Sequence, residues 1–552
     1  MSLSKVEKST TDRFFTFESF LLLLSFLSTC VGRRKQIYSP AFMEDIENVQ
    51  NTESRNIERV AGSLFGRRDI YTAVDEITED NVVYEVNSAL SYHFMNVIEM
   101  EYLYWYRRGL QPILNRTKER NEFVLNRVVE NHADEIVTFK NGYFLMEPAF
   151  YIARGDKVDA DKVNTLNEYL YRSGKQDADN DLADWFHTVG KAALFVEPNK
   201  GEDAEEIPVK AYALDPRSAF VVYSLKPGNK PMFGVNIVID GNHAKIDVFT
   251  DDKVYRLSGG ASTTPTTSYP TYQTTATNVD AVENNAIGKI PIIEYRYNSV
   301  NMGSFEAVTY LLDEINNIQS NRCDGVEQFI QSLAVAVNCQ FDDGTTAAQI
   351  RKAGMVALKS IGENKADFKI LSEELDQQQT QTLVDDLYEK VLVICSMPST
   401  ARGGRGTYDS TGAAAIFNNG WEQAFSAARN TEDLFRKSNR HFDEIFLAIL
   451  KQKGIVDLSP VNVKLNFVRN ETAGAQSKAQ AMQTMLAAGL APEIALAKSG
   501  ISNDPVADYA ASKKYMDMIW GDPDKVDETE QAGNGQGEAV VVEDDRVTEE
   551  EI

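Results

Sequence analysis

The stretch Lys289–Phe329, KIPIIEYRYNSVNMGSFEAVTYLLDEINNIQSNRCDGVEQF, contains the pattern on which the fold depends. It begins with a short β-rich run, Ile290–Tyr295, and passes through an Asn/Gly/Ser turn into a segment with helical periodicity. We predict a helix from Gly303 to Leu333, which would be about 46 Å long if Gly325 does not interrupt it. The stretch therefore predicts a short strand followed by one long helix.

The predicted helix has one apolar face and one polar face. The apolar positions, which we expect to be buried, are Phe305, Val308, Leu311, Leu312, Ile315, Ile318, Val326, Phe329, Ile330 and Leu333. The opposite face carries acids and amides, which we expect to meet solvent, at Glu306, Asp313, Glu314, Asn317, Asn321, Asp324 and Glu327.

An unusual order of elements follows this helix. Short strand-like runs at 334–341, 356–358 and 368–371 precede a second predicted helix at 380–394. The apolar stripe of that helix consists of Leu383, Leu387, Val391 and Ile394, and Met397-Pro398 ends the helix. A Gly-rich loop at 401–412 then leads into a third long helix at 413–453.

The region before Lys289 predicts helices first and strands later. Residues 44–120 and 126–137 read as mainly helical, and Lys140-Asn141-Gly142 is a hairpin-type turn signal. Helices at 162–171 and 180–189 precede a strand at 192–196, and alternation over 209–257 predicts antiparallel β structure. Residues 258–285, rich in Thr, Ser, Pro and Gly, predict a flexible loop. The acidic segment from about Gly521 predicts disorder.

Composition narrows the functional classes. The 552 residues have a formal net charge of −26 and a pI near 4.7, which excludes a protein coated in basic surface to grip phosphates. The four cysteines, Cys30, Cys323, Cys339 and Cys395, form no CxxC pair and predict buried thiols in a reducing compartment. The apolar stretch 14–32 leaves three interpretations open: an extension ahead of a natural start at Met43, a buried or partner-binding helix, or a membrane anchor.

No motif in the sequence predicts a catalytic, metal or cofactor site. The loop at 403–412 lacks the GxxxxGK[ST] spacing of an ATP site. The run Asp177-Ala-Asp179-Asn-Asp181 imitates an EF-hand loop, but Leu182 stands where glycine is needed, so helix capping explains these acids better. The five histidines, at 93, 132, 187, 243 and 441, show no metal-ligand spacing.

The order helix, small β module, helix, Gly-rich loop, long helix resembles that of tailed-phage portal proteins of the SPP1-like group. Further similar segments flank it at Asn126–Asn131, Ile136-Val137, Gly142-Tyr143, Leu214–Pro216, Val221–Tyr223, Phe467–Asn470, Ala487–Ala491 and Asn503–Pro505. The resemblance implies a mixed α+β portal fold with a helical stem, a small β-containing clip, an α/β wing and a helical crown, assembled as a ring. Its implied divisions are 1–43 (extension), 44–300 (wing), 301–333 (first stem helix), 334–375 (clip), 376–397 (second stem helix), 398–412 (tunnel loop), 413–455 (tunnel helix), 456–520 (crown) and 521–552 (acidic tail).

The resemblance also implies a function without catalysis. A dodecameric ring at a capsid vertex of the virion, assembled in the host cytoplasm, would pass double-stranded DNA during packaging and ejection. Its other partners would be the major capsid protein, the terminase and the head–tail connector, with no cofactor, no metal and no membrane. The tunnel loop would supply Arg402, Gly403, Gly404, Arg405, Gly406, Thr407, Tyr408 and Ser410 to the channel. Stem packing between helices and subunits would use Phe305, Val308, Leu311, Leu312, Ile315, Leu383, Leu387 and Val391.

Two functions of other classes stay as alternatives. One is a metal-dependent nucleic-acid-processing enzyme that uses paired acids such as Asp385 and Asp386, although adjacent helical residues point apart. The other is a membrane-anchored scaffold that uses residues 14–32.

Overall fold

The computed structural model describes residues 66–118, 124–154, 160–264, 271–330, 377–398, 420–468 and 475–502, with short stretches inside 333–371 and 508–515. The architecture is mixed α+β, with two compact units that are described separately. The larger unit comprises Met1–Phe150, Thr165–Pro460 and Phe467–Arg469, and the smaller comprises Tyr151–Asn164, Val461–Asn466 and Asn470–Ile552.

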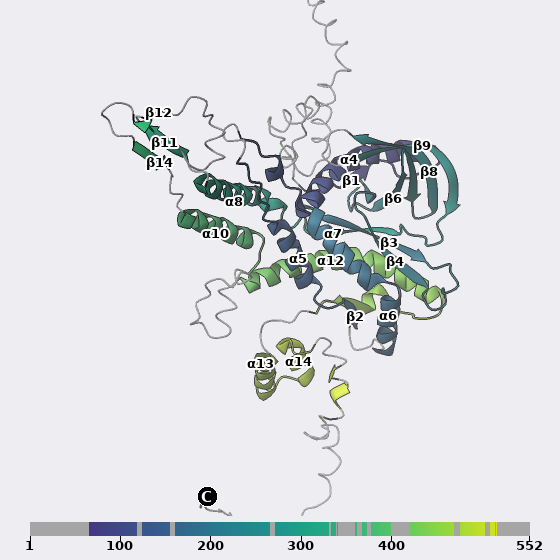
Figure 1. Cartoon of the computed structure of the whole chain (residues 1–552). Helices are drawn as coiled ribbons and strands as arrows, with labels where there is room; N and C mark the ends of the chain where they lie inside the picture. Colours follow the sequence, from purple (N-terminus) through teal and green to yellow (C-terminus); the bar gives the residue numbers. More distant parts are fainter. Residues whose placement is uncertain are drawn as a thin grey trace, which may run out of the picture. The chain divides into compact units, whose positions relative to one another are not determined.

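A six-stranded sheet forms one part of the larger unit (Figure 1). Its order is β1-β5-β6-β7-β8-β9, in which β1 is parallel to β5 and every later pair is antiparallel. The strand bounds are β1 Ile70–Thr72, β5 Ala219–Ser224, β6 Pro231–Asp240, β7 His243–Phe249, β8 Lys253–Thr264 and β9 Thr271–Asn284. Helix α4, Val82–Arg107, packs its Val82, Val86 and Leu90 against the sheet, so that one core forms between them.

The predicted flexible loop at 258–285 is wrong, because β8 and β9 form a long hairpin through most of it. Only residues 265–270 between the two strands lie outside the described part of the chain. The Thr and Val residues that look like low-complexity loop are β-branched and favour a pleated strand when a partner strand is available. Asn87 on α4 also holds the edge strand, since its side-chain amide exchanges two hydrogen bonds with the backbone of Ala276, 2.8 and 2.9 Å.

A second sheet has three antiparallel strands in the order β10-β3-β4, and one of its faces packs against the six-stranded sheet. Its strands are β3 Lys191–Pro198, β4 Val209–Leu214 and β10 Ile292–Arg296. Helix α7, Lys175–Val189, packs on β3 and β4, and the long helix α12, Trp421–Gln452, packs on β10. Helix α6, Ala160–Arg172, precedes α7. The Tyr295 hydroxyl on β10 donates to Asn439 Oδ1 on α12 at 3.0 Å, which fixes helix to strand.

The chain leaves β10 through a 3-10 turn, η2 (Glu306–Val308), into α8, Thr309–Ile330. Short paired strands follow, β11 Leu333–Val337 with β14 Asp367–Leu371 and β12 Cys339–Gln340 with β13 Lys359–Ser360. Helix α10, Gln377–Ile394, then returns beside α8 (Figure 1). Helix α8 passes through Gly325 without a break, and its 22 residues span about 33 Å. It is shorter than predicted at both ends, because η2 occupies 306–308 and strand β11 begins at Leu333.

Residues 109–144 depart most from the predicted elements. The Asn141-Gly142 turn prediction is wrong, because both residues lie inside helix α5, His132–Phe144. The helical spacing of Ile136, Val137 and Phe144, all buried, outweighs the local Asn-Gly signal. A 3-10 turn, η1 (Pro112–Asn115), lies upstream, and residues 124–131 form no helix.

The smaller unit contains a two-stranded sheet and two short helices. Strand β2, Phe150–Ala153, pairs with β15, Val463–Asn466, which follows the 3-10 turn η4, Pro460–Asn462. Helices α13, Ala475–Ala487, and α14, Pro492–Ser499, contact each other. Residues 1–65, with the apolar stretch 14–32, and the acidic tail 521–552 lie outside the described residues.

Candidate functional site: the helix pair α8 and α10

The predicted site residues fall into two groups. The eight in the Gly-rich loop, from Arg402 to Ser410, lie outside the described residues. The other eight lie in η2, α8 and α10, or directly before them, and the structure brings these segments together. The helix pair is therefore the part of the predicted site whose geometry can be described.

Helices α8 and α10 run antiparallel. Near the end of α8, Arg322 donates to Gln381 Oε1 on α10 at 2.7 Å. Beside the start of α8, the Cys395 thiol just past α10 contacts the Ser304 carbonyl oxygen at 3.6 Å. One hydrophobic cluster joins both helices to α4 and α5, and its members on the pair include Leu312, Ile315, Ile318, Val384, Tyr388, Val391 and Leu392.

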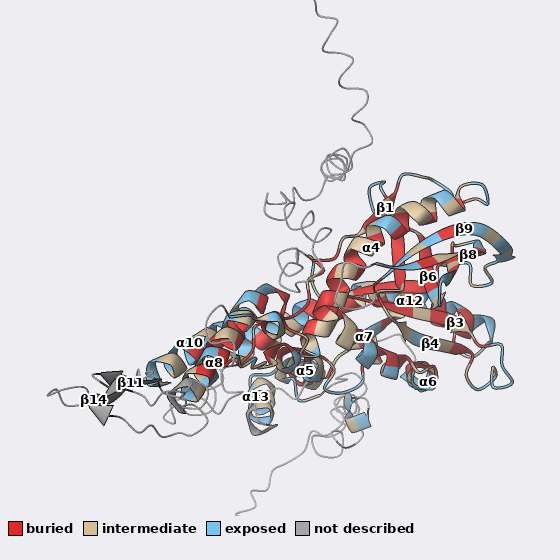
Figure 2. Cartoon of the chain, turned by 45° about the horizontal axis from the view of Figure 1, so that its top comes forward, coloured by how far each residue is buried: buried red, intermediate tan, exposed pale blue. Residues whose placement is uncertain are grey.

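The eight predicted packing residues differ in burial. Phe305, Val308, Leu312, Ile315 and Val391 are at most 1% exposed inside their own chain, and Leu311 and Leu387 are partly buried against the same cluster. Leu383 lies on the outer surface of α10 with 48% of its area exposed. Figure 2 shows the same division, with buried residues where the helices meet the body of the unit and exposed residues on their outer surfaces.

A second stripe of α8 is polar and nevertheless buried. Asn316, Ser320 and Asp324 follow one another at intervals of four residues and are at most 3% exposed. They face the segment 126–130, which forms neither helix nor strand and which we call the strap. Three backbone N–H groups of the strap donate to these side chains. The Asn126 N–H donates to Asp324 Oδ1 at 2.7 Å, and the Val128 N–H donates to Ser320 Oγ at 2.9 Å. The Glu130 N–H donates to Asn316 Oδ1 at 2.8 Å.

The spacing of these three contacts follows from the two backbones. Four residues of an α-helix rise about 6.0 Å, and two residues of an extended chain rise about 6.6 Å. Every second N–H of the strap therefore meets every fourth residue of α8 over three successive contacts. The strap satisfies three of its five backbone N–H donors this way, without pairing in a sheet.

The last of these contacts is charged. Asp324 Oδ2 accepts from Arg116 at 3.0 Å and from Lys118, and Asp324 Oδ1 also accepts from the Asn126 side chain at 3.0 Å. Burial alone would raise the pKa of Asp324, but the hydrogen bonds from Lys118 and Asn126 lower it below its ordinary value. The expectation that Asp324 meets solvent is therefore wrong.

The same correction applies to Glu306 at the base of the pair. Its carboxylate is 3% exposed and accepts from Arg67 at 2.7 Å and from the Gly303 N–H at 2.8 Å. Arg67 also contacts Glu99 on α4 at 3.1 Å, and Arg68 contacts Glu99 at 2.9 Å. Burial raises the pKa of Glu99, and the two arginines offset part of that rise. Glu306 is buried and its carboxylate is occupied by Arg67 and by the Gly303 N–H, so it is not available to a channel.

The other acids and amides of the predicted polar face vary. Glu314 and Asn321 are exposed, whereas Asp313 is half-buried and accepts from the Tyr106 hydroxyl at 2.8 Å. The sequence did contain a signal for the buried polar stripe, since Asn316, Ser320 and Asp324 have strict helical spacing. It contained none for the partner, because the strap lies nearly 200 residues earlier in irregular structure.

Asp385 and Asp386 are exposed on α10 and bond within their own helix, to Gln381 and Lys390. Within the described ranges there is no group of three or more His, Cys, Asp or Glu side chains placed to hold a metal ion. In the same ranges no helix is both long and apolar enough to span a membrane.

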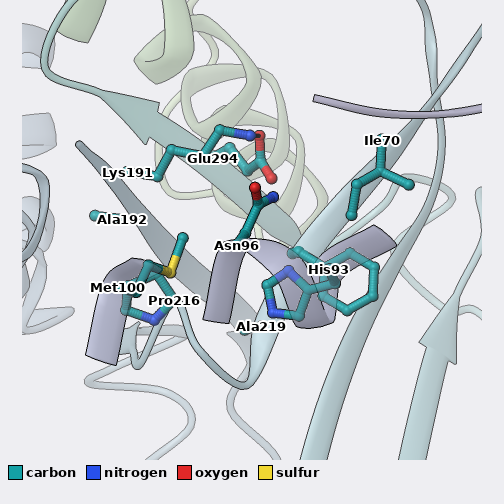
Figure 3. Close-up of a pocket in the computed structure, with 10 residues that line it drawn as sticks. Ile70, His93, Asn96, Met100, Lys191, Ala192, Pro216, Ala219 and Glu294 are labelled. Atoms are coloured by element: carbon teal, nitrogen blue, oxygen red, sulfur yellow. Dashed lines mark hydrogen bonds and ion pairs between the residues drawn. The ribbon is translucent and has the colours of Figure 1, made fainter. Parts of the chain in front are cut away.

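A small cavity lies away from the helix pair, among α4, β3, β5 and β10 (Figure 3). His93, Asn96, Lys191 and Glu294 line its polar side, and Ile70, Met100 and Ala219 are among its apolar lining. Lys191 bonds to Glu294 at 3.2 Å and to Asp69 at 2.9 Å, so its charge is already paired. At about 10 Å³ the cavity has room for about one water molecule and none for a nucleotide.

A known protein family matches most of the chain. The family model described as "Phage portal protein, SPP1 Gp6-like" matches residues 85–517. No curated protein matches the chain.

Solved structures similar to the chain belong to a gene transfer agent (GTA) particle. One chain is from the virion of the native particle and another is from the neck of the native particle computed with C12 symmetry. Each has 12% identity, a TM-score of 0.39, and coverage of 67% of this chain and 90% of the other. A third, from the neck of the empty particle computed with C6 symmetry, has the same identity and coverage with a TM-score of 0.36.

Proposed function

Because the chain belongs to the SPP1 Gp6-like family of phage portal proteins, we propose that it assembles into a dodecameric ring around an axial DNA channel at one capsid vertex. The family is structural and not enzymatic. The observation that carries the proposal is the unit α8, β11–β14 and α10, inside the matched region and followed by the long helix α12.

We assign the portal parts to the described elements as follows. Helices α8 and α10 are the stem, the short strands β11 to β14 are the clip, and α12 is the tunnel helix. The two sheets with α4 and α7 form the wing, and α13 and α14 belong to the crown. The three hydrogen bonds between the strap and α8 support a stem helix with one fixed position on the wing.

The charge of the chain suits DNA that slides without being held. A carboxylate near a phosphate is repelled, so an acidic channel wall offers the duplex no deep binding site. Exposed Glu314 on α8 is the described acid of this helix that remains available for such a wall. A ring of twelve would carry −26 × 12 = −312 formal charges, which counterions and apolar subunit contacts must offset.

The remaining partners follow from the family. During packaging the ring would seat the terminase motor, and afterwards the head–tail connector, with the major capsid protein around the wing. Assembly would take place in the host cytoplasm and the product would be part of the virion. The tunnel loop, residues 398–412, would contact double-stranded DNA without sequence specificity through Arg402 and Arg405.

The mass of the purified particle tests the assembly. Twelve copies of a 61.7-kDa chain amount to about 740 kDa, which native mass spectrometry resolves from rings of eleven or thirteen. A stable monomer with metal-dependent nuclease activity would overturn the proposal in favour of the enzymatic alternative.

The double variant Arg402→Ala/Arg405→Ala tests the tunnel loop. We expect rings of normal mass and reduced packaging of DNA into proheads. The matched control is Lys245→Ala/Lys253→Ala, which removes the same charge from exposed positions on the six-stranded sheet and leaves packaging unchanged. Normal packaging by the loop variant would remove the proposed role of the two arginines.

A further inference from the structure

His132, the first residue of α5, lies between two carboxylates. Its Nε2 is 3.2 Å from Glu130 Oε2 on the strap, and its Nδ1 is 2.7 Å from Glu135 Oε2 on α5. The histidine is 8% exposed, and its ring packs on the Tyr388 ring of α10 at a centroid distance of 4.5 Å. Both ring nitrogens therefore face oxygen atoms that can only accept a hydrogen bond while ionised.

This arrangement requires a proton. A neutral imidazole has one N–H and one bare nitrogen, so it can donate to one of the two carboxylates and must oppose the other with a lone pair. An imidazolium has two N–H groups and donates to both. The geometry is therefore complete in the charged state of His132 alone.

Each carboxylate is tied to a different helix of the pair. On one side, Glu130 Oε1 accepts from Gln319 on α8 at 2.7 Å, and the Glu130 backbone N–H donates to Asn316 on α8. On the other side, Glu135 Oε1 accepts from the Tyr388 hydroxyl on α10 at 2.5 Å. Protonated His132 is thus the middle of a hydrogen-bonded chain that runs from α8 through the strap and α5 to α10.

The two helices also meet directly, which closes the chain into a loop. Arg322 on α8 donates to Gln319 Oε1 and to Gln381 Oε1 on α10, both at 2.7 Å. When the contact at His132 is lost, α10 keeps its apolar contacts and this polar link, which lies one turn further along α8. The expected change is therefore a local loosening of α10 and the strap, without unfolding of the unit.

We propose that His132 is a proton-dependent joint that couples the two long helices, closed when the imidazole is charged and loosened when it is neutral. The titratable groups that face it are Glu130 from the strap, Glu135 from α5 and Tyr388 from α10, and α8 faces this site with the amides of Asn316 and Gln319. The proposal depends on the fold of the chain and not on the channel function.

The direction of the pH effect follows. Burial alone would lower the pKa of His132, but its hydrogen bonds to Glu130 and Glu135 raise it above the ordinary 6.5. A raised pKa in the folded state means that the stabilisation is fully present below pH 6.5 and is lost as pH rises through the folded value. The joint therefore loosens as pH rises through the folded-state pKa of His132, which lies above 6.5.

Hydrogen–deuterium exchange of the intact full-length protein tests the joint. We compare α10 and strap peptides at pH 6 and pH 9 after correction for intrinsic exchange. In the wild-type protein we expect both peptides to exchange at least about tenfold faster at pH 9, because a charge-assisted hydrogen bond is lost. Equal protection at the two pH values would overturn the proposal.

Two variants separate the proton from the contact. His132→Gln carries one donor and one acceptor group, as neutral imidazole does, and we expect fast exchange at both pH values. Glu130→Gln can accept from Gln319 and donate its N–H to neutral His132, so we expect slow exchange at both. A Glu130→Gln protein that keeps the wild-type pH dependence would contradict the joint even if His132→Gln fails to fold.

Titration of His132 gives a direct readout. Deuterium exchange at the imidazole C2 position, measured by mass spectrometry, follows the protonation of individual histidines in large assemblies. We expect a midpoint above 6.5 for His132 and a lower midpoint in Glu130→Gln. His243→Gln, at an exposed position on β7, is the control that should leave the exchange of α10 unchanged. A wild-type midpoint at or below 6.5 would also overturn the proposal.

Discussion

Helix α8 is buried along two faces by two different kinds of contact. Towards α10 and α4 it presents Leu312 and Ile315, which join a hydrophobic cluster. Towards the strap it presents Asn316, Ser320 and Asp324, which accept backbone hydrogen bonds from every second residue. Both faces are closed to water. The first holds the helix through buried apolar surface, and the second holds it through directional hydrogen bonds.

The difference determines what each face can tolerate. Apolar contact is non-directional, so a helix held by it alone could rotate or slide with a modest loss of free energy. Three hydrogen bonds at matched spacing define one position along the helix, because a shift by one residue would leave both the strap donors and the α8 side chains unpaired. We infer that the apolar face supplies most of the free energy of folding and the polar face fixes the register of α8.

The largest expected effect is on the apolar face. Replacement of Leu312 by Ala removes a side chain that is 1% exposed and leaves a cavity between α8 and α10. Such changes cost about 2–5 kcal/mol. Native-state hydrogen exchange should show α8 and α10 losing protection together, by a similar factor. A loss confined to α8 would mean that the two helices do not share one core.

A smaller but more informative effect is expected from Asp324→Ala. The variant leaves Arg116, Lys118 and the Asn126 N–H without their carboxylate, at a cost of about 1–3 kcal/mol, and we expect exchange to increase in the strap more than in α10. Glu389→Ala, which removes an exposed carboxylate from α10, is the control. Equal loosening of α10 and the strap would show that the two faces are not separable.

Acid should act at the same site. The pKa of Asp324 is lowered in the folded state, so its stabilisation is present above the ordinary value of 3.8 and is lost as pH falls through the folded value. The protection of strap amides should therefore fall on acidification in the wild-type protein. Asp324→Asn should start with lower protection and show a flatter response over the same pH range.

The two faces were not equally predictable from the sequence. The helical periodicity of Phe305, Val308, Leu312 and Ile315 predicts their burial, because an apolar stripe is buried whichever element packs against it. Asn316 and Asp324 look like residues of a solvent-facing surface, since such side chains are seldom buried without a partner. Their partner is a segment of irregular backbone far away in the sequence, and no local pattern announces it.

The same reasoning explains the error at 258–285. Composition alone gave a flexible loop, whereas β8 and β9 become strands because each supplies the other with hydrogen bonds over most of its length. Thr and Val fit such a hairpin as well as they fit an exposed loop, so the presence of a partner strand determines which structure forms. The tunnel-loop residues from Arg402 to Ser410 are a different case, because they lie outside the described residues and their role stays a prediction.

A weaker contact of the polar face is expected at Ser320. Replacement of Ser320 by Ala removes one acceptor, 2.9 Å from the Val128 N–H, at a cost of about 1 kcal/mol. Strap exchange near Val128 should rise about fivefold, with little change at either neighbouring contact if each bond acts independently. Ser91→Ala, at an exposed position on α4, is the matched control. A rise along the whole strap would show that the three contacts open as one unit.

The smallest effect on the fold is expected at Leu383, the leucine of α10 that is 48% exposed. Leu383→Ala should change the free energy of exchange in α10 by less than about 0.5 kcal/mol, because its side chain contributes little to the buried cluster of its own chain.

Other apolar side chains on the outer surface of the pair are at least 50% exposed, namely Tyr310, Val326, Val393 and Ile394. If neighbouring copies cover this surface in the ring, Leu383→Glu should leave the isolated chain folded and shift the mass distribution from rings to smaller species. Rings of unchanged mass and stability would remove Leu383 from the predicted packing set. They would leave the stem contacts of the ring to be made by other surfaces of α8 and α10.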